Sequence, residues 1–108
     1  MPLTRAFKET VKARLERDAA FGEAMLTEGV AALLAGDVET GKAVLRDYVN
    51  ATIGFDKLAE AINTPVKSLM RMLGPHGNPT AGNLFAIISE LQRASGIQLH
   101  VMVNRKAA

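Results

Sequence analysis

Residues 55–73, with the sequence FDKLAEAINTPVKSLMRML, have the pattern of two short helices joined by a tight turn. In the first half, Leu58, Ala59 and Ile62 recur at the spacing of one helical face, and charged residues occupy positions turned away from it. Asn63 stands where the chain must reverse, and asparagine enters the left-handed backbone region more readily than most residues. This pattern is typical of a helix-turn-helix, a unit that can place its second helix in a groove of DNA.

The second half of this stretch predicts a helix that begins at the turn. Thr64 offers an N-cap oxygen, and Pro65 suits the first helical position because its φ is already fixed near the helical value. The expected buried face consists of Leu69, Met72 and Leu73. The opposite face presents hydrogen-bond donors, which are Lys67, Ser68 and Arg71. Arg71 and Lys67 can each contact guanine or clamp a phosphate, and the alternative for all three donors is an ordinary solvated surface.

Four further helices are predicted around this motif from capping residues and apolar spacing. Their expected ranges and caps are Arg5–Arg17 after Thr4, Ala19–Leu34 after Asp18, Val38–Ile53 after Asp37, and Ala81–Ser95 after Thr80. Gly36, Gly54 and Gly96 stand where three of these helices should end. Residues 74–79, GPHGNP, are too rich in glycine and proline to continue a helix and should form a loop.

Beyond Gly96 the hydrophobic period changes from that of a helix to that of a strand. The apolar positions of this segment are Ile97, Leu99, Val101 and Val103. Their alternation with the residues between them predicts a strand with one buried face. A lone strand leaves its backbone groups unpaired, so we expect it to pair with the same strand of a second copy or with another protein's sheet edge. The alternative is a strand that packs only on the helices.

Together these elements predict a mainly α, essentially all-α fold of five to six helices in a single domain, residues 1–108. Residues 1–36 would form an N-terminal helical extension, residues 37–95 a repressor-like helix-turn-helix core, and residues 96–104 a short C-terminal β-strand. A chain of 108 residues, of which 48% are apolar, is long enough for one core of the common domain size.

The net charge of +2 is small, but the charges are unevenly distributed. Residues 1–60 carry ten acids and eight Lys or Arg, whereas residues 61–108 carry one acid and five Lys or Arg. No acid occurs between Ala61 and Ser89, the stretch that contains the second helix of the motif and the following loop. This favours contact with phosphate oxygens, which repel carboxylates. The alternative is chance combined with a solvated surface.

Several classes of function lack the residues they require. The chain has no cysteine, so disulfides, thiolate metal sites and cysteine nucleophiles are excluded. His100 has no companion ligands at metal-binding spacing, and GPHGNP lacks the Gly-Lys-Ser/Thr of a phosphate-binding loop. We therefore expect no enzyme, no cofactor and no metal. No apolar run approaches the roughly 20 residues that span a bilayer, and no secretory signal precedes the first helix, so we expect a soluble cytoplasmic protein without membrane contact.

The chain resembles the helix-turn-helix antitoxins of bacterial toxin–antitoxin operons, and specifically the probable addiction-module antidote family, which is HigA-like and related to phage-repressor-type regulators. The resemblance rests on LAEAINTPVKSLMRML at 58–73, on GNPT at 77–80, and on NLFAIISELQ followed by GIQLHV within 83–101. It covers roughly the second half of the chain, and GNPT before an apolar helix is its more specific part. The first half agrees with the family only in general character.

This resemblance implies a protein that neutralises a small toxin, of the RelE or HigB ribonuclease type, and represses its own operon by binding operator DNA as a homodimer. The residues it places at double-stranded DNA are Thr64, Val66, Lys67, Ser68 and Arg71, with His76 and Asn78 near the backbone. Val66 stands where relatives commonly place arginine or glutamine, and it can contact at best a thymine methyl. The acidic first half, through residues 5–34, would meet a basic toxin.

Two other functions stay open at this level. The first is an orphan or phage-like helix-turn-helix transcriptional regulator that has no toxin. The second is a protein-interaction module that does not bind DNA, for which Val66 is the main reason. Salt dependence separates this module from a DNA-binding protein, because a protein that makes several phosphate contacts loses affinity steeply as salt rises.

Overall fold

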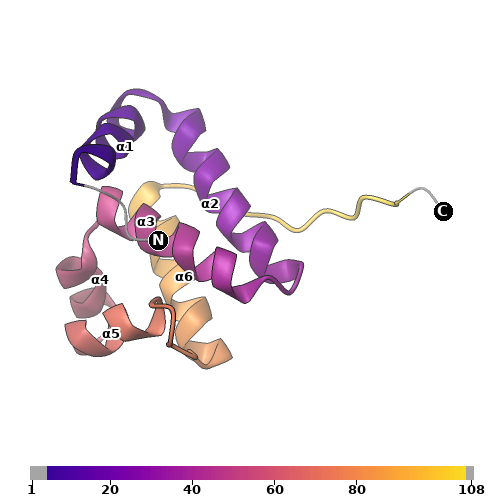
Figure 1. Cartoon of the computed structure of the whole chain (residues 1–108). Coiled ribbons are helices and arrows are strands. Elements are labelled where there is room, and N and C mark those ends of the chain that lie inside the picture. Colours follow the sequence, from indigo (N-terminus) through magenta and orange to yellow (C-terminus); the bar gives the residue numbers. More distant parts are fainter. Residues whose placement is uncertain (1–4, 107–108) are drawn as a thin grey trace.

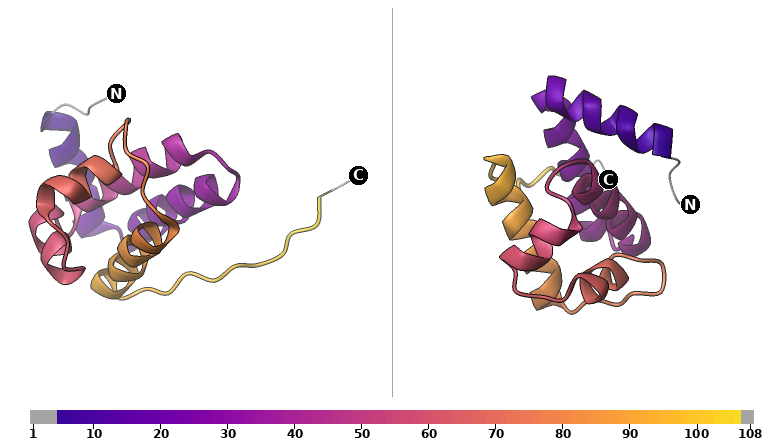
Figure 2. Two further views of the ribbon diagram at one scale, coloured as in Figure 1. Left: turned by 90° about the horizontal axis from the view of Figure 1, so that it is seen from below. Right: turned by 90° about the vertical axis from the view of Figure 1, so that its left-hand side faces the viewer.

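A computed structural model describes residues 5–106 of the chain, which contain six helices and match the helical part of the expected fold class. The helices in chain order are α1 (Arg5–Arg17), α2 (Ala19–Leu34), α3 (Val38–Ala51), α4 (Phe55–Ala61), α5 (Val66–Met72) and α6 (Ala81–Ser95). Figure 1 shows α3 in the middle, with α2 alongside it and α4 and α5 at the opposite side from the turn between α2 and α3. The right-hand view of Figure 2 places α1 at the far end of the molecule from α4 and α5.

Three of the four N-caps predicted for the helices around the motif are confirmed. The side chains of Asp18, Asp37 and Thr80 accept hydrogen bonds from backbone N–H groups three residues later, at 3.3, 3.3 and 3.1 Å. Each such cap satisfies a donor that the helix itself leaves unpaired and contributes about 0.5–2 kcal/mol. The fourth predicted cap, Thr4, lies outside the described residues.

Two predicted helix boundaries are wrong. The third helix ends at Ala51 rather than Ile53, because Thr52 leaves the helical region at φ −123° and ψ −101°. The fifth helix begins at Val66, with Pro65 and not Thr64 at the N-cap position. Pro65 has an extended ψ of 138°, and the Thr64 hydroxyl donates backwards to the Ile62 carbonyl oxygen at 3.2 Å instead of capping α5.

The core lies where α3 meets α2 and the three later helices. Its fully buried aliphatic side chains are Leu26, Leu45, Val49, Leu58, Leu69, Leu73 and Ile87. Helices α2 and α3 approach closely because glycines face each other across the contact. A Cβ on Gly41 would lie 2.5 Å from Leu33 Cδ2 and 3.2 Å from the carbonyl oxygen of Gly29. A side chain at position 41 would therefore push the two helices apart.

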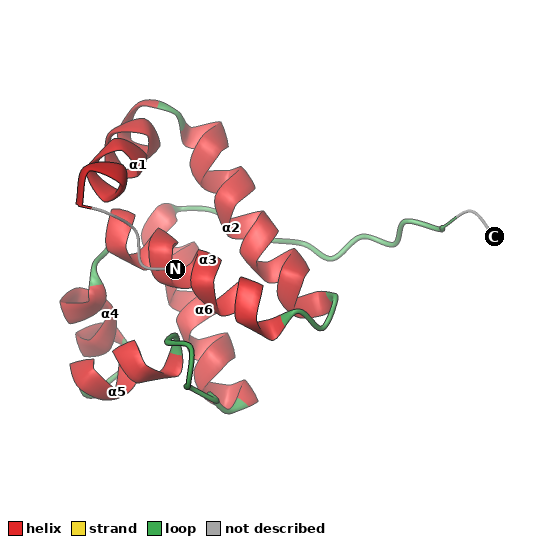
Figure 3. Cartoon of the chain, in the orientation of Figure 1, coloured by secondary structure: helices red, strands yellow, loops and turns green. Residues whose placement is uncertain are grey.

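The predicted C-terminal strand is wrong for this chain alone. Residues 97–106 are extended but form no strand, and the part of the chain that the structure describes contains no strand with which they could pair (Figure 3). Ile97 and Leu99 are half-buried against the helices, and the Leu99 N–H donates to Gln92 Oε1 at 2.7 Å. The segment then leaves the helical body, as its yellow trace shows in Figure 1.

Beyond that point, residues 101–103 are 82–89% exposed. Of the four alternating apolar residues, Ile97 and Leu99 therefore pack on the helices, whereas Val101 and Val103 are exposed.

Within residues 5–106, no helix combines the length and the apolar character that a membrane crossing requires.

Candidate nucleic-acid interface

Helices α4 and α5 are joined by a tight turn that the backbone itself closes. Asn63 has a φ of 52° and is the only residue other than glycine with a positive φ among those described. The Thr64 N–H donates to the Ala59 carbonyl oxygen at 2.9 Å, which ties the turn to the end of α4. Leu58 and Leu69 are fully buried and fix the two helices on the core. The expected role of Asn63 in reversing the chain is confirmed.

The outward face of α5 carries the predicted hydrogen-bond donors. Lys67 and Arg71 are exposed, and Ser68 is half-buried between them. Among the described residues, neither Lys67 nor Arg71 takes part in an ion pair. Met70 is 51% exposed on the same stretch of helix and was not predicted as a site residue. Met70 differs from a core methionine because it is exposed on the helix that also carries the exposed Lys67 and Arg71.

The other predicted contact residues are divided between this face and its surroundings. His76 and Asn78 are exposed in the loop that follows α5, so they can approach a ligand lying along α5. Thr64 is half-buried in the turn. Val66 is also half-buried, and it packs against the hydrophobic core. Val66 therefore contributes to holding α5 in place, and only part of its surface is free for contact.

The charge around α5 favours an anionic ligand on one side only. A hollow between α4 and the turn is lined by Asp56 and Glu60, which would repel phosphate. Beyond the turn, the first acid along the chain is Glu90, and its carboxylate is engaged by the Arg93 guanidinium through two hydrogen bonds. These bonds lower the pKa of Glu90. An anion would therefore approach across Lys67 and Arg71 toward the loop.

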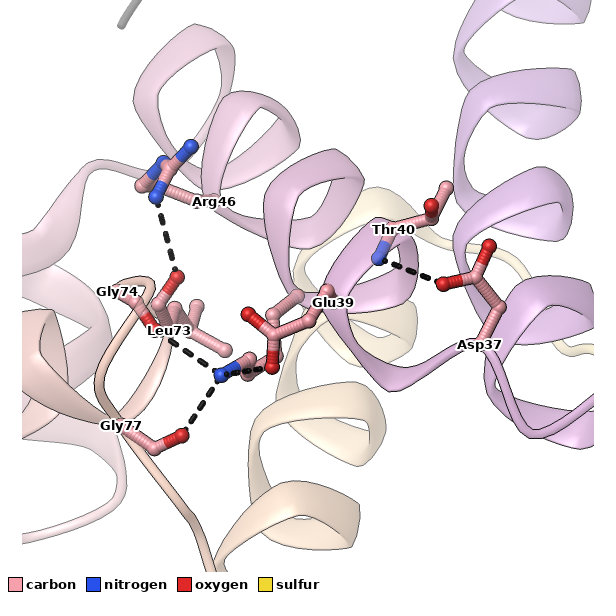
Figure 4. Close-up of polar contacts among 8 residues, drawn as sticks. Asp37, Glu39, Thr40, Arg46, Leu73, Gly74 and Gly77 are labelled. Atoms are coloured by element: carbon pink, nitrogen blue, oxygen red, sulfur yellow. Dashed lines mark hydrogen bonds and ion pairs between the residues drawn. The ribbon is translucent and has the colours of Figure 1, made fainter. Parts of the chain in front are cut away.

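Two cations of α3 hold the end of α5 and this loop from behind (Figure 4). Lys42 is only 1% exposed, and its Nζ donates to the carbonyl oxygens of Gly74 at 3.1 Å and Gly77 at 2.7 Å. Arg46 Nη1 donates to the Leu73 carbonyl oxygen at 3.3 Å. The Leu73 carbonyl stands at the C-cap of α5, where carbonyl groups carry partial negative charge and lack partners within the helix, so a cation stabilises it. The Gly74 and Gly77 carbonyls belong to the loop, and Lys42 serves as their hydrogen-bond donor.

Sequence reasoning missed Lys42, although a signal was present. Lys42 lies four residues after Val38 and three before Leu45, on the face of α3 that the apolar residues define. A lysine on the apolar face of a helix requires partners, because an unpaired charge is almost never buried.

No protein-family model, curated protein or solved structure matches this chain. Its function is therefore inferred from where its side chains lie. Within residues 5–106, no three His, Cys, Asp or Glu side chains gather where they could hold a metal ion, and His100 is exposed on the extended segment. The exposed donors of α5 and the loop that follows this helix therefore form the candidate site of this chain.

Proposed function

We propose that this chain is a DNA-binding antitoxin and transcriptional autorepressor, in which α4 and α5 act as a helix-turn-helix. One observation carries the DNA-binding part of the proposal. The outward face of α5 bears Lys67 and Arg71, both exposed and without ion-pair partners among the described residues, in a stretch with no acid from residue 61 to 89. A helix with these donors can enter the major groove and contact guanine or phosphate.

The remaining site residues divide into two roles in this proposal. Ser68 and Met70 lie within α5 and would face the groove, where a methionine side chain can contact a thymine methyl. His76 and Asn78, in the loop after α5, would contact the phosphate backbone, which fixes the register of a protein on DNA without reading sequence. Thr64, before α5, lines the acidic hollow and donates its hydroxyl to the Ile62 carbonyl oxygen, so it would contribute least. Val66 would serve mainly to pack α5 on the core.

The antitoxin part of the proposal rests on the acidic side of the molecule. Residues 18–41 contain five acids and no Lys or Arg. Leu34, at the end of α2, is 70% exposed, and Val38, at the start of α3, is 43% exposed. Figures 1 and 2 show the turn between α2 and α3 on the opposite side from α4 and α5, so both surfaces can be occupied together. A basic partner, such as a RelE/HigB-type ribonuclease toxin, is complementary to this surface.

The extended segment supports a homodimer. The side chains of residues 101–103 are highly exposed, and the segment pairs with no strand among the described residues. Pairing with the same segment of a second copy would satisfy its backbone groups and cover these side chains. A dimer would also present two α5 helices to two half-sites of an operator.

The test is binding of the purified protein to the DNA upstream of its own gene, compared with a scrambled duplex of equal length, together with coexpression of the neighbouring gene. Preference for the upstream duplex and copurification of a small basic protein support both parts. DNA preference without a partner supports an orphan or phage-like regulator. A partner without DNA affinity, even at low salt, supports an interaction module and overturns the DNA-binding proposal.

A further inference from the structure

Lys42 is a fully buried cation that the proposed DNA contacts do not use. Its Nζ lies 2.9 Å from Glu39 Oε2, in addition to its two carbonyl partners. Its three N–H donors thus have three acceptors, on Glu39, Gly74 and Gly77, which are labelled in Figure 4. Glu39 is largely exposed, at 66%, so water can replace it as a partner. The two carbonyl bonds are the ones that join α3 to a distant part of the chain.

These bonds act on a helix that has little stability of its own. Helix α5 has seven residues, far fewer than an isolated helix needs to persist in water. The loop after it turns back over its end: the Gly74 N–H donates to the Arg71 carbonyl oxygen at 3.0 Å, and Gly77 lies against the same carbonyl. A Cβ on Gly77 would come within 2.0 Å of that oxygen. The loop therefore packs closely on the end of α5, and Lys42 anchors it to α3.

We propose that Lys42 is a positioning residue of the DNA-binding surface. Its ammonium group fixes the end of α5 and the loop carrying His76 and Asn78 relative to α3, so that the donors of helix and loop reach one duplex together. This inference rests on the proposed DNA-binding function. Lys42 itself does not touch the DNA, because its side chain is 2% exposed and lies behind the loop.

Loss of the two Lys42–carbonyl bonds should lower the affinity for DNA, because fewer molecules would have the loop in the arrangement that binds. When only a fraction of molecules has the loop docked, the apparent Kd rises by the inverse of that fraction. The salt dependence of binding should stay unchanged, because the bound state makes the same number of phosphate contacts. A lysine that contacted phosphate directly would instead reduce the salt slope by about one when it is removed.

The experiment compares Lys42→Met, Lys42→Arg and Glu39→Gln with the unaltered protein. It measures affinity for the upstream duplex across a salt series, thermal unfolding, and amide hydrogen exchange. We expect Lys42→Met to weaken binding by about tenfold or more at unchanged salt slope, and to accelerate exchange in residues 71–80 but not in α2. Lys42→Arg should recover most of the affinity, since a hollow of about 180 Å³ beside Lys42, lined by Arg46 and Pro75, can take the larger group. Glu39→Gln should bind as the unaltered protein does.

The outcomes separate the two claims. If the unaltered protein shows no DNA preference, the proposed function fails and this inference fails with it. If the unaltered protein binds and Lys42→Met binds equally well, only the role of Lys42 is overturned. Faster exchange throughout α2, α3 and α6 would mean that Lys42 stabilises the whole fold and does not position α5. If Lys42→Met does not fold, Lys42→Gln, which removes the charge but keeps a donor, is compared in the same three measurements.

Discussion

Lys42 Nζ donates a hydrogen bond of 2.7 Å to the carbonyl oxygen of Gly77, a residue 35 positions further along the chain. This bond connects α3, the central helix of the fold, to the loop that closes over the end of α5. The same loop carries the exposed His76 and Asn78 and turns back over the end of α5. The arrangement of the candidate DNA surface therefore depends on a contact made from the side opposite to the proposed ligand.

The first prediction concerns the fit of Gly77. Gly77→Ala would place a Cβ 2.0 Å from the Arg71 carbonyl oxygen and 2.7 Å from that of Met72, so the backbone must shift. We expect a loss of about 1–3 kcal/mol in the free energy of unfolding, measured by urea denaturation, and weaker DNA binding.

The matched control for this change is Gly82→Ala. Among the described residues, only Thr80 Oγ1, at 4.0 Å, approaches the Cβ position of Gly82, which lies in the first turn of α6. Alanine there should be neutral or stabilising by up to about 1 kcal/mol. Equal stability of the two variants would contradict the close packing of the loop on α5.

The second prediction concerns the extended segment. Replacing both Val101 and Val103 by aspartate should convert a dimer to a monomer, because like charges on paired strands repel each other and the cross-strand apolar contacts are lost. The fold should survive, since both side chains are more than 80% exposed. Sedimentation velocity gives the oligomeric state, and circular dichroism gives the helical content. An unaltered protein that sediments as a monomer at high concentration would rule out pairing through this segment.

The third prediction concerns pH. Burial raises the pKa of Asp47 on α3, and attraction by Arg46 opposes this only in part. A carboxyl group with a raised folded-state pKa destabilises the protein where it is ionised, and this effect disappears as pH falls through the folded-state pKa to below the ordinary value of 3.8. Asp47→Asn should therefore raise the melting temperature at pH 7 and have a smaller effect at pH 3. A larger increase in melting temperature at pH 3 than at pH 7 would contradict a raised pKa of Asp47.

Local features of this fold could be predicted from the sequence because their causes are local. The caps at Asp18, Asp37 and Thr80 bond to N–H groups only three residues away. The left-handed Asn63 likewise follows from the preference of one residue type. Thr64 failed as a cap because the proline after it keeps an extended ψ, so helical geometry begins one residue later.

The features that were not predicted depend on contacts between residues far apart in the chain, which local spacing in the sequence does not reveal. Alternation at residues 97–103 predicted a strand, but a strand also needs a partner, and the described part of this chain provides none. Lys42 bonds to carbonyls 32 and 35 residues away, so its role appears only once α3 and the loop are placed together. Within the candidate site, the residue types of α5 were predictable, whereas the support behind α5 was not.

The central claim, that the face of α5 binds DNA, is tested most directly by fluorescence anisotropy of Arg71→Ala and the unaltered protein on the upstream duplex across a salt series. Lys12→Ala, which removes an exposed cation on α1, is the matched control. We predict that Arg71→Ala weakens binding and, if the Arg71 side chain contacts phosphate, reduces the salt slope by about one. The free energy of unfolding should stay within about 0.5 kcal/mol of that of the unaltered protein. Lys12→Ala should bind as the unaltered protein does. Equal affinities of all three proteins, or no binding even at low salt, would contradict the claim.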